Sequence, residues 1–544
     1  MQDIVNPKTM NQPLTREIRR RRTFAIISHP DAGKTTLTEK LLLFGGAIQA
    51  AGTVKARKSG RYAASDWMAV EQQRGISVSS SVMQFEYREH VINLLDTPGH
   101  QDFSEDTYRV LTAVDAALMV IDAAKGVEAQ TIRLLEVCRL RKTPIITFIN
   151  KLDREVREPL ELLDEIEQVL KIRCAPITWP VGMGKSFRGV FHLPRDEMHR
   201  FRPGEGYHHA EVEAIKGIDD PVLDAHYPME VGSLRAEVDL VRGASEPFDH
   251  QAYLRGEQSP VFFGSAINNF GVRELLQSVI DWAPPPQPRD GGSREVGPLE
   301  PSFSGFVFKI QANMDPRHRD RIAFLRICSG RLTPEMRVTH VRIGRQFRIS
   351  HPLTFMANER TALDEAVAGD VIGIHNHGQF QIGDTLTEGE PLAFKGIPYF
   401  APELFMRARL KDPLKGKQLN NALKEVGEEG AIQVFQLAQG GPPVLGAVGQ
   451  LQFEIVSHRL QAEYGVPALF EPVNVRVARW VRAPNMSALR EFEKGNPARL
   501  ATDVDGNRVF LAESNAILQL IMERWPDIEL LTTREHGEHL QANT

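Results

Sequence analysis

A short apolar run, Phe24 to Ile27, passes directly into a glycine-containing turn, and helix-forming residues follow from Lys34 to Phe44. This order predicts a buried strand, a tight loop and a helix. In such a unit the free backbone N–H groups of the first helical turn point at the loop. The positive end of the helix dipole lies at the same place. We therefore expect phosphate groups to bind at Ser28, His29, Pro30, Asp31, Ala32, Gly33, Lys34, Thr35 and Thr36.

Two side chains of this loop have distinct expected roles. Lys34 would reach the β- and γ-phosphates of a nucleotide, and the hydroxyl of Thr35 would coordinate a magnesium ion. The usual pattern opens with glycine, and Ser28 is small enough to take that place. A Gly-Lys-Thr triplet occurs by chance in many proteins, so the prediction of a phosphate-binding loop depends on the other motifs.

A second motif, Asp96-Thr97-Pro98-Gly99-His100, follows the apolar run Val91 to Leu95. A carboxylate at the end of a strand can hold the magnesium shell through water, which is the expected role of Asp96. Gly99 would let its backbone N–H approach a γ-phosphate. The alternative is an ordinary strand-to-turn junction, which the order and spacing of the motifs disfavour.

A third motif, Asn150-Lys151-Leu152-Asp153, follows the apolar run Pro144 to Ile149. The carboxylate of Asp153 can accept the two N–H hydrogens on one edge of guanine, a pair that adenine does not offer. Asn150 would brace the pocket, and the stem of Lys151 would lie over the purine. Gly264-Ser265-Ala266 completes the set, because the N–H of Ala266 can meet the guanine O6 and Ser265 lines the same turn.

All four motifs stand in order, each at the end of a predicted strand, where open parallel sheets bind their ligands. The sequence therefore predicts a site for GTP and GDP with Mg²⁺.

Two further residues bear on hydrolysis. Arg74-Gly75-Ile76-Ser77 lies between the first two motifs, where GTPases keep a switch that senses the γ-phosphate. Ser77 is expected to give its hydroxyl to magnesium, and the alternative is a surface turn. His100 is expected to orient the attacking water, the role that glutamine fills in other GTPases. A lone histidine is more often structural, but its place beside Gly99 favours catalysis.

The fold class follows from the alternation of strands and helices. Further strands are expected at 116–121 and 261–263, with helices at 130–139 and 271–282, which gives a parallel sheet covered on both faces. From 303 to 390 short β runs at 305–310, 321–327, 337–340 and 370–375 predict a small β-barrel. After Tyr399, strands at 404–410 and 432–436 with helices at 417–428 and 450–464 predict an α+β domain. We find no convincing internal repeat.

These patterns give a multidomain α/β chain. Residues 1–285 are expected to form a P-loop GTPase domain with an insertion at about 173–249, followed by a Pro- and Gly-rich linker at 286–298. A β-barrel domain at 299–397 and an α+β domain at 398–544 complete it. The length of 544 residues requires several cores.

Composition narrows the class of partner and the compartment. The net charge of -5 argues against a generally basic nucleic-acid binder. Cys138, Cys174 and Cys328 are far apart and offer neither a zinc site nor a disulfide framework. The residues from Met1 to Thr15 lack the apolar core of a signal peptide, and no apolar run is long enough to span a bilayer. We expect a soluble cytoplasmic protein.

The motifs Asp31 to Thr36, Arg74 to Ser77 and Asp96 to Phe103 resemble those of the translation-factor GTPases, a group that includes elongation factor G. Within that group, Ser28 to Asp31 and the serine at 77 are similar to the class-II release factor family, because elongation factor G normally has threonine at that switch position. Phe306 to Arg321 and Val448 to Val456 extend the resemblance, so that it covers nearly the whole chain.

This resemblance implies a ribosome-dependent GTPase of translation termination, and we expect it to act as a monomer. The implied partners are the ribosome, through its RNA and proteins, and class-I peptide release factors, with no membrane and no DNA. GTP binding would promote departure of the class-I factor after peptide release, and ribosome-stimulated hydrolysis would free the GTPase.

Three alternatives remain open on the residues. An elongation-factor-G-like translocase or ribosome-protection protein would need further domains, and only about 150 residues follow the predicted barrel. A GTP-sensing regulatory ribosome-binding module would not need His100. A metabolic P-loop kinase would not need the pocket of Asn150 and Asp153.

Charged segments outside the motifs are less specific. The run Arg19 to Arg22 is interpreted as a solvated lead-in to the first strand, or else as a nucleic-acid contact. His536 and His539 are interpreted as surface residues. Two basic clusters are candidates for contacts with ribosomal RNA: Arg407, Arg409, Lys411, Lys415 and Lys417, and Arg476, Arg479 and Arg482.

Overall fold

The computed structural model describes residues 12–48, 71, 76–200, 213–312, 320–356, 359–538 and 540. The chain divides into two compact units, which are described separately. The first comprises Met1–His100, Ala113–Gln287 and Phe355–Arg360, and the second comprises Gln101–Thr112, Pro288–Thr354 and Thr361–Thr544.

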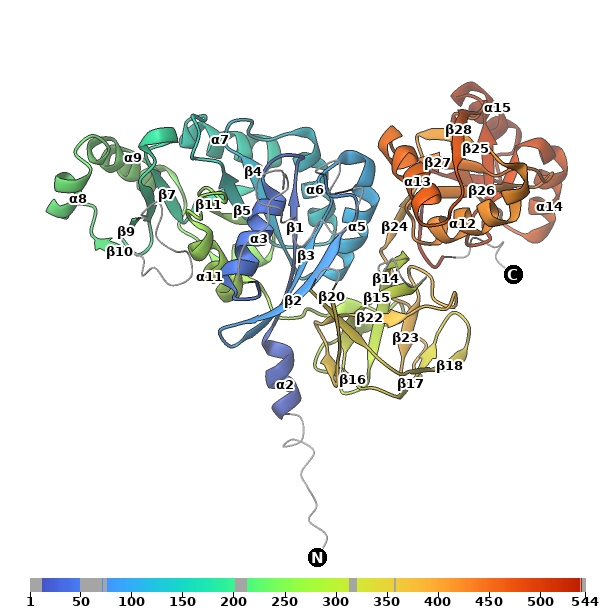
Figure 1. Cartoon of the computed structure of the whole chain (residues 1–544), viewed down its shortest axis with the longest axis horizontal. Coiled ribbons are helices and arrows are strands. Elements are labelled where there is room, and N and C mark those ends of the chain that lie inside the picture. The colour runs from blue at the N-terminus through green and yellow to red at the C-terminus, as the bar shows by residue number, and fades with distance from the viewer. Residues whose placement is uncertain are drawn as a thin grey trace, which may run out of the picture. The chain divides into compact units, whose positions relative to one another are not determined.

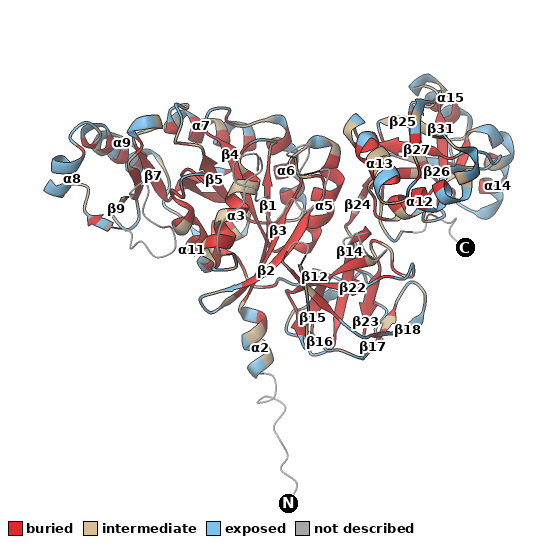
Figure 2. Cartoon of the chain, viewed as in Figure 1, coloured by how far each residue is buried: buried red, intermediate tan, exposed pale blue. Residues whose placement is uncertain are grey.

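The first unit is built on a twisted, mostly parallel sheet (Figure 1). Its strand order is β2-β3-β1-β4-β5-β11-β6, and only β2 runs antiparallel to its neighbour. The strands are β1 (Arg21–Ser28), β2 (Ser81–Tyr87), β3 (His90–Asp96), β4 (Ala116–Asp122), β5 (Ile145–Asn150), β6 (Arg173–Pro176) and β11 (Gln258–Phe263). The predicted parallel sheet is confirmed, and its apolar strands are buried throughout (Figure 2).

Helices cover this sheet as the alternating pattern predicts. They are α3 (Lys34–Phe44), α6 (Ala129–Leu140), α7 (Pro159–Leu170), α10 (His250–Leu254) and α11 (Val272–Trp282). Helix α2 (Gln12–Arg19) precedes β1 and projects beyond the end of the sheet (Figure 1). Leu37 of α3 and Leu276 of α11 pack in one core with Phe24 and Phe148 of the strands. The helix predicted at 34–44 has those bounds in the structure.

A second, smaller sheet lies within the first unit. Its strands β7 (Thr178–Val181), β8 (Gly189–His192), β9 (Glu197–Arg200) and β10 (Glu213–Lys216) pair antiparallel in the order β10-β9-β8-β7. Helices α8 (Pro221–His226) and α9 (Val231–Ala244) follow, and the Trp179 indole donates to Glu237 at 2.7 Å. Because β6 pairs with β11 in the central sheet, this separate sheet begins only at Thr178.

The interpretation of Arg19 to Arg22 as a solvated lead-in is wrong for its second half. Arg19 ends α2, but Arg21 and Arg22 are the first residues of β1. Arg21 is buried and donates to Glu17 at 2.6 Å, and Arg22 donates to the carbonyl of Ile280 at 3.0 Å. These partners, which a charge run alone does not reveal, hold the two side chains against the fold.

The first part of the second unit is antiparallel. Its main sheet has the order β18-β17-β23-β14-β15-β22. Its strands are β14 (Ser304–Ala312), β15 (Arg321–Ser329), β17 (Met336–His340), β18 (Arg345–Ile349), β22 (Val371–His375) and β23 (Thr385–Thr387), with β16 (Arg331–Leu332) paired to β21 (Ala366–Val367). The segment expected to be a linker holds a hairpin of β12 (Arg289–Asp290) and β13 (Glu295–Val296). The chain changes from one unit to the other within β19 (Leu353–Met356) and again within β20 (Glu359–Ala362).

The C-terminal part of the second unit repeats one motif. The first half runs β25 (Leu404–Leu410), α12 (Gly416–Glu428), β26 (Gln433–Leu437), β27 (Val444–Ala447), α13 (Gln450–Ala462) and β28 (Ala468–Pro472). The second half runs β29 (Val477–Arg482), α14 (Met486–Gly495), β30 (Leu500–Thr502), β31 (Arg508–Ala512), α15 (Asn515–Arg524) and β32 (Glu529–Leu531). Both halves are β-α-β-β-α-β units.

The two halves share one antiparallel sheet of order β28-β25-β27-β26-β30-β31-β29-β32, joined where β26 pairs with β30. Each half has a core of its own, around Phe453 in the first and Phe492 in the second. The expectation of no internal repeat is therefore wrong at the level of structure, because the halves share topology without matching sequence motifs. β24 (Pro398–Phe400) pairs with β33 (Thr533–Glu535) beside them.

The interpretation of His536 as a surface residue is only partly right, because the residue is half-buried. Its ring lies 4.4 Å from that of Tyr399 between centroids, and its Nε2 atom is buried. Burial, and then the charges of Arg534 and Arg109, hold the pKa of His536 well below its usual range. His539 and the segment Asn313 to Arg319 lie outside the described residues.

Candidate functional site

The loop between β1 and α3 has the backbone shape that phosphate binding needs. Ser28 is buried at the end of β1, and Asp31 and Gly33 take positive φ angles of 64° and 96°. Helix α3 begins at Lys34, so the N–H groups of its first turn face the loop without intrahelical acceptors. A Cβ on Gly33 would collide with the amide nitrogen of Asn150, which makes glycine necessary here.

A buried ion pair lies beneath this loop. Lys34 Nζ is 2.5 Å from Asp96 Oδ1, and both side chains are almost wholly buried, with exposed fractions of 5% and 2%. Asp96 Oδ2 is buried without a hydrogen-bond partner in the part of the chain that the structure describes. The turn after Asp96 is fixed by Thr97, whose hydroxyl donates to the Ile26 carbonyl at 2.7 Å.

Two hydroxyls lie at the same end of the sheet. Thr35 Oγ1 and Ser77 Oγ are 3.4 Å apart, although the residues are distant in sequence. Thus Thr35, Ser77 and Asp96, the three predicted magnesium ligands, supply oxygen atoms of the kind that magnesium prefers. Arg74 and Gly75 lie outside the described residues.

Gly99 lies against the phosphate loop. A Cβ added to Gly99 would be 3.4 Å from the Cα of Pro30, so the two turns approach each other closely. His100 follows at once and is half-buried. The structure therefore brings the second motif beside the first, as the sequence predicts.

Asn150 connects three loops of the site. Its Nδ2 donates to the Ala32 carbonyl at 2.8 Å, and its Oδ1 accepts from the N–H of Ala266 at 2.9 Å. One amide side chain thereby joins the ends of β1, β5 and β11.

Lys151 is held from two sides. Its Nζ donates to Asp122 Oδ2 at 2.7 Å and to the Asp31 carbonyl, and its backbone has a positive φ of 75°. Burial alone would raise the pKa of Asp122, but the hydrogen bonds from Lys151 and from the N–H of Ala124 lower it. Asp122 was not among the predicted site residues, although its place at the end of the apolar run 116–121 was a usable signal.

Asp153 and Ser265 form the edge of the predicted guanine pocket. Ser265 Oγ donates to Asp153 Oδ1 at 2.5 Å, which orients the carboxylate. A hydrogen bond from the N–H of Leu152 to the Gly264 carbonyl, at 3.2 Å, holds the two loops together.

His29 has a partner that the sequence did not indicate. Its Nε2 lies 3.0 Å from Glu128 Oε1, just before α6. Burial lowers the pKa of His29, and the Glu128 carboxylate opposes that shift. Because the ring is turned to Glu128, His29 is left with its backbone N–H for a phosphate.

Two other kinds of feature are absent from the described residues. No group of three or more His, Cys, Asp or Glu side chains among them is arranged to hold a metal ion. No helix in the same part of the chain is long and apolar enough to cross a membrane.

The predicted ribosomal RNA contacts are only partly available. Arg409 pairs with Glu471 at 2.7 Å, Lys415 donates to the Gly465 carbonyl at 2.6 Å, and Arg482 pairs with Glu538 at 2.8 Å. The remaining members of both clusters are Arg407, Lys411, Lys417, Arg476 and Arg479.

Three family models match the chain. "Elongation factor Tu GTP binding domain" matches residues 19–285, "Elongation factor G domain 2" matches 302–389, and "Class II release factor RF3, C-terminal domain" matches 394–522. These matches fall on the parallel-sheet region, the antiparallel region and the repeated C-terminal region.

Two relatives cover most of the chain. Peptide chain release factor 3 of Aromatoleum aromaticum is 67% identical over 532 residues, which are 97% of each chain. A crystal structure of a protein from Thermus thermophilus superposes with a TM-score of 0.69 at 25% identity, covering 85% of this chain and 69% of that one.

Proposed function

The chain belongs to the peptide chain release factor 3 family, and from that premise we propose that it is the GTPase that removes class-I release factors from the ribosome after peptide release. The family makes it a GTPase of translation termination. The proposal adds that the GTP form drives departure of the class-I factor and that the ribosome stimulates hydrolysis.

The observation that carries this proposal is the 67% identity over 97% of the chain, because it extends through the C-terminal region as well as the GTP-binding domain. A match confined to residues 19–285 would have supported only GTP binding. The match to the release-factor C-terminal model at 394–522 ties the chain to termination.

Lys34 and Asp96 prepare the site for a triphosphate. Two buried charges 2.5 Å apart compensate each other, whereas either one alone would be costly in this buried place. An arriving triphosphate offers Lys34 a competing anion, and Asp96 then turns to other partners. The backbone N–H groups of His29 and of residues 31–35 would surround the phosphates.

Magnesium fits the oxygen atoms that the site presents. The buried Asp96 oxygen, which has no partner among the described residues, and the neighbouring hydroxyls of Thr35 and Ser77 make a hard, oxygen-only set. When bound, Mg²⁺ neutralises negative charge on the β- and γ-phosphates.

Base selection would rest on Asp153. Its carboxylate, oriented by Ser265, would accept two N–H hydrogens from guanine. The N–H of Ala266 donates to Asn150 Oδ1 in this structure, so it would have to share that hydrogen with O6. Lys151, fixed by Asp122, keeps its stem over the ring. Adenine would leave these groups unpaired, which is the strongest form of discrimination available to such a pocket.

His100 would act on water. It follows Gly99, whose turn lies against Pro30 of the phosphate loop, so the residue would lie near the γ-phosphate. The ring orients the water for in-line attack and accepts a hydrogen bond from it, in the place that glutamine takes in other GTPases.

The test is departure of a fluorescent class-I release factor from ribosomes paused at a stop codon after peptide release. The full chain is added with GTP, GDP or a non-hydrolysable GTP analogue. Faster departure that requires the GTP form supports the proposal. No acceleration, together with strong ribosome-stimulated GTP hydrolysis, would refute the termination role and move the step to translocation, recycling or rescue.

A further inference from the structure

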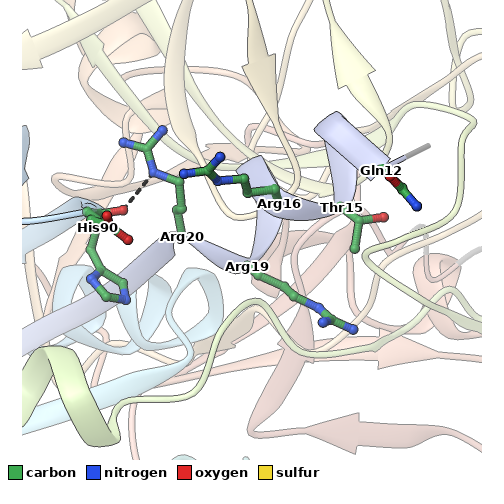
Figure 3. A pocket seen from close by; sticks show the side chains of 7 residues that line it. Gln12, Thr15, Arg16, Arg19, Arg20 and His90 are labelled. Atoms are coloured by element: carbon green, nitrogen blue, oxygen red, sulfur yellow. Dashed lines mark hydrogen bonds between the residues drawn. The ribbon is translucent and has the colours of Figure 1, made fainter. Parts of the chain in front are cut away.

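A pocket of about 470 Å³ lies beside α2, away from the nucleotide loop (Figure 3). It is formed by one side of α2 and by the turn between β2 and β3, which contributes Glu89 and His90. We call it the α2 pocket. Three arginines, Arg16, Arg19 and Arg20, and one carboxylate, Glu89, line it, so the lining is positive although the whole chain carries -5.

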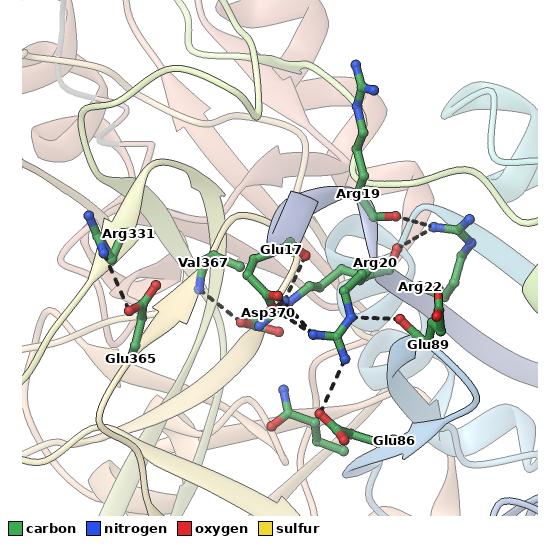
Figure 4. A network of polar contacts seen from close by, with 12 residues as sticks. Glu17, Arg19, Arg20, Arg22, Glu86, Glu89, Arg331, Glu365, Val367 and Asp370 are labelled. Atoms are coloured by element: carbon green, nitrogen blue, oxygen red, sulfur yellow. Dashed lines mark hydrogen bonds and ion pairs between the residues drawn. The ribbon is translucent and has the colours of Figure 1, made fainter. Parts of the chain in front are cut away.

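Arg20 is already committed to the fold. Its Nε donates to the Glu89 carbonyl at 2.6 Å, and its other nitrogens pair with Glu17 at 2.9 Å and Glu86 at 3.5 Å (Figure 4). These contacts neutralise Arg20 and fix the wall of the pocket.

Arg16 and Arg19 are exposed, and their guanidiniums have no partner in the described part of the chain. Standing three residues apart on α2, they project from neighbouring positions of one helix side. Two such forks, each able to hold an anion bidentately, fit two successive phosphates of a chain.

His90 adds a neutral polar group. Its Nδ1 is buried without a hydrogen-bond partner among the described residues. Burial, and then the charge of Arg22, lower the pKa of His90, so its ring is neutral at pH 7. A neutral imidazole can serve a sugar hydroxyl or a phosphate oxygen.

We propose that the α2 pocket is a second phosphate-binding site, separate from the nucleotide loop, and that it holds the sugar–phosphate backbone of ribosomal RNA through Arg16 and Arg19. The proposal rests on the ribosome-bound role inferred above. An open pocket with exposed guanidiniums suits a strand that passes over it, and the 2′-hydroxyl of RNA gives the neutral histidine a partner that DNA lacks. The exposed carboxylate of Glu89 opposes the ligand and limits its affinity.

The first test compares two double variants of the full chain, each bound to a non-hydrolysable GTP analogue. Arg16→Gln with Arg19→Gln removes the proposed contacts, and Arg133→Gln with Arg490→Gln removes two exposed charges elsewhere. Binding to purified ribosomes is measured over a fourfold range of KCl concentration. GTP affinity of each variant, measured without ribosomes, verifies that it is folded.

Each lost single-strand phosphate contact makes the log–log salt slope shallower by about 0.7, so the first variant should lose about 1.4. Over the fourfold salt range, its deficit in ribosome affinity should therefore shrink by about sevenfold from the lowest to the highest KCl concentration. Glu89→Gln should tighten binding instead. A first variant that matches the control in affinity and slope would overturn the inference while leaving the proposed function intact.

The second test identifies the ligand. Cys138, Cys174 and Cys328 are buried, so Pro13→Cys supplies the accessible thiol for a tethered iron chelate beside the pocket. Cleavage of ribosomal RNA near the chelate supports the proposal. Loss of affinity in the first variant without RNA cleavage would assign the pocket to a ribosomal protein and overturn it. Failure of the unmodified chain to bind ribosomes would refute the proposed function itself.

Discussion

In our proposals the nucleotide loop and the α2 pocket both bind phosphates through positive charge, but they do so in opposite ways. The loop uses backbone N–H groups and one buried lysine paired with Asp96, whereas the pocket uses exposed guanidiniums. Burial makes each contact of the loop strong and intolerant of a wrong ligand, because an unpaired buried group is costly. Exposure makes the pocket tolerant and sensitive to salt. The nucleotide loop would therefore select the nucleotide, whereas the α2 pocket would steer the protein to its phosphate partner, and both lie in the same unit.

The largest effect should follow from changing the base-reading carboxylate. Asp153→Asn replaces one acceptor by a donor, which suits xanthine, whose C2 carries an oxygen in place of the amino group. The preference for GTP over XTP should fall by about 10⁴-fold or more, measured by displacement of a fluorescent nucleotide. Asp164→Asn, on the exposed side of α7, is the control. Loss of GTP binding with no gain for XTP would show that Asp153 only braces Ser265.

The next effect concerns hydrolysis. His100→Ala should lower ribosome-stimulated kcat by about 10²- to 10⁴-fold, the usual contribution of one group acting on a proton or water. The Kd for GTP should stay within about twofold, since the ring lies beyond the phosphate contacts. His351→Ala, at an exposed position, serves as control. Turnover that survives the change would remove His100 from the mechanism.

A smaller effect tests the backbone of the loop. Gly33→Ala places a side chain at a φ of 96° and against Asn150, so GTP and GDP affinity should fall about 10- to 100-fold, the equivalent of about 1–3 kcal/mol of strain. Gly46→Ala is the matched control, because it also places a side chain at a positive φ, of 73°, but its added Cβ meets nothing within 4 Å. Equal losses in both variants would mean that strain alone, without the Asn150 contact, sets nucleotide affinity.

The smallest expected effect concerns the pH dependence of ribosome binding at the α2 pocket. Burial and then the charges of Arg22 and Arg20 lower the pKa of His90, and the carboxylates of Asp281 and Glu89 oppose that shift. Because the pKa of His90 lies below its ordinary value of 6.5, fewer than half of the rings are charged at pH 6.5, so ribosome affinity should rise only slightly between pH 8 and pH 6.5 through this group. His90→Gln should weaken binding about twofold and equally at both values, as expected for one neutral hydrogen bond. A rise in affinity of the unmodified chain that His90→Gln abolishes would show that the ring becomes charged.

Local patterns predicted the phosphate loop and the strands β1, β3, β4, β5 and β11, because each of these strands contains an apolar run and each motif stands at a strand end. They did not predict β2 or β6. These local patterns did not predict the contacts that complete the site. The pairs Lys34–Asp96 and His29–Glu128 join residues 62 and 99 positions apart in the chain, and no periodicity connects their partners. Asp122 could have been predicted, because it ends a strand that the apolar run 116–121 had already indicated.

The C-terminal region shows a different limit. Its first half was predicted through Leu404–Leu410 and the two helices after it, but the second half was not resolved into elements. Strands of three residues such as Leu500–Thr502 are too short for an alternating pattern, and their identity depends on pairing with β26 and β31. The two halves of the C-terminal region share their topology but not their sequence motifs, so only the structure reveals the repeat.

The burial of the three cysteines has a consequence for oxidative damage. Burial raises the pKa of Cys138 to about 12, so at pH 7 only about one thiol in 10⁵ is ionised. Peroxides and disulfides attack the thiolate, and an enclosed thiol offers them neither the charge nor the access. Oxidants that act on accessible thiolates would therefore find no exposed cysteine in this chain.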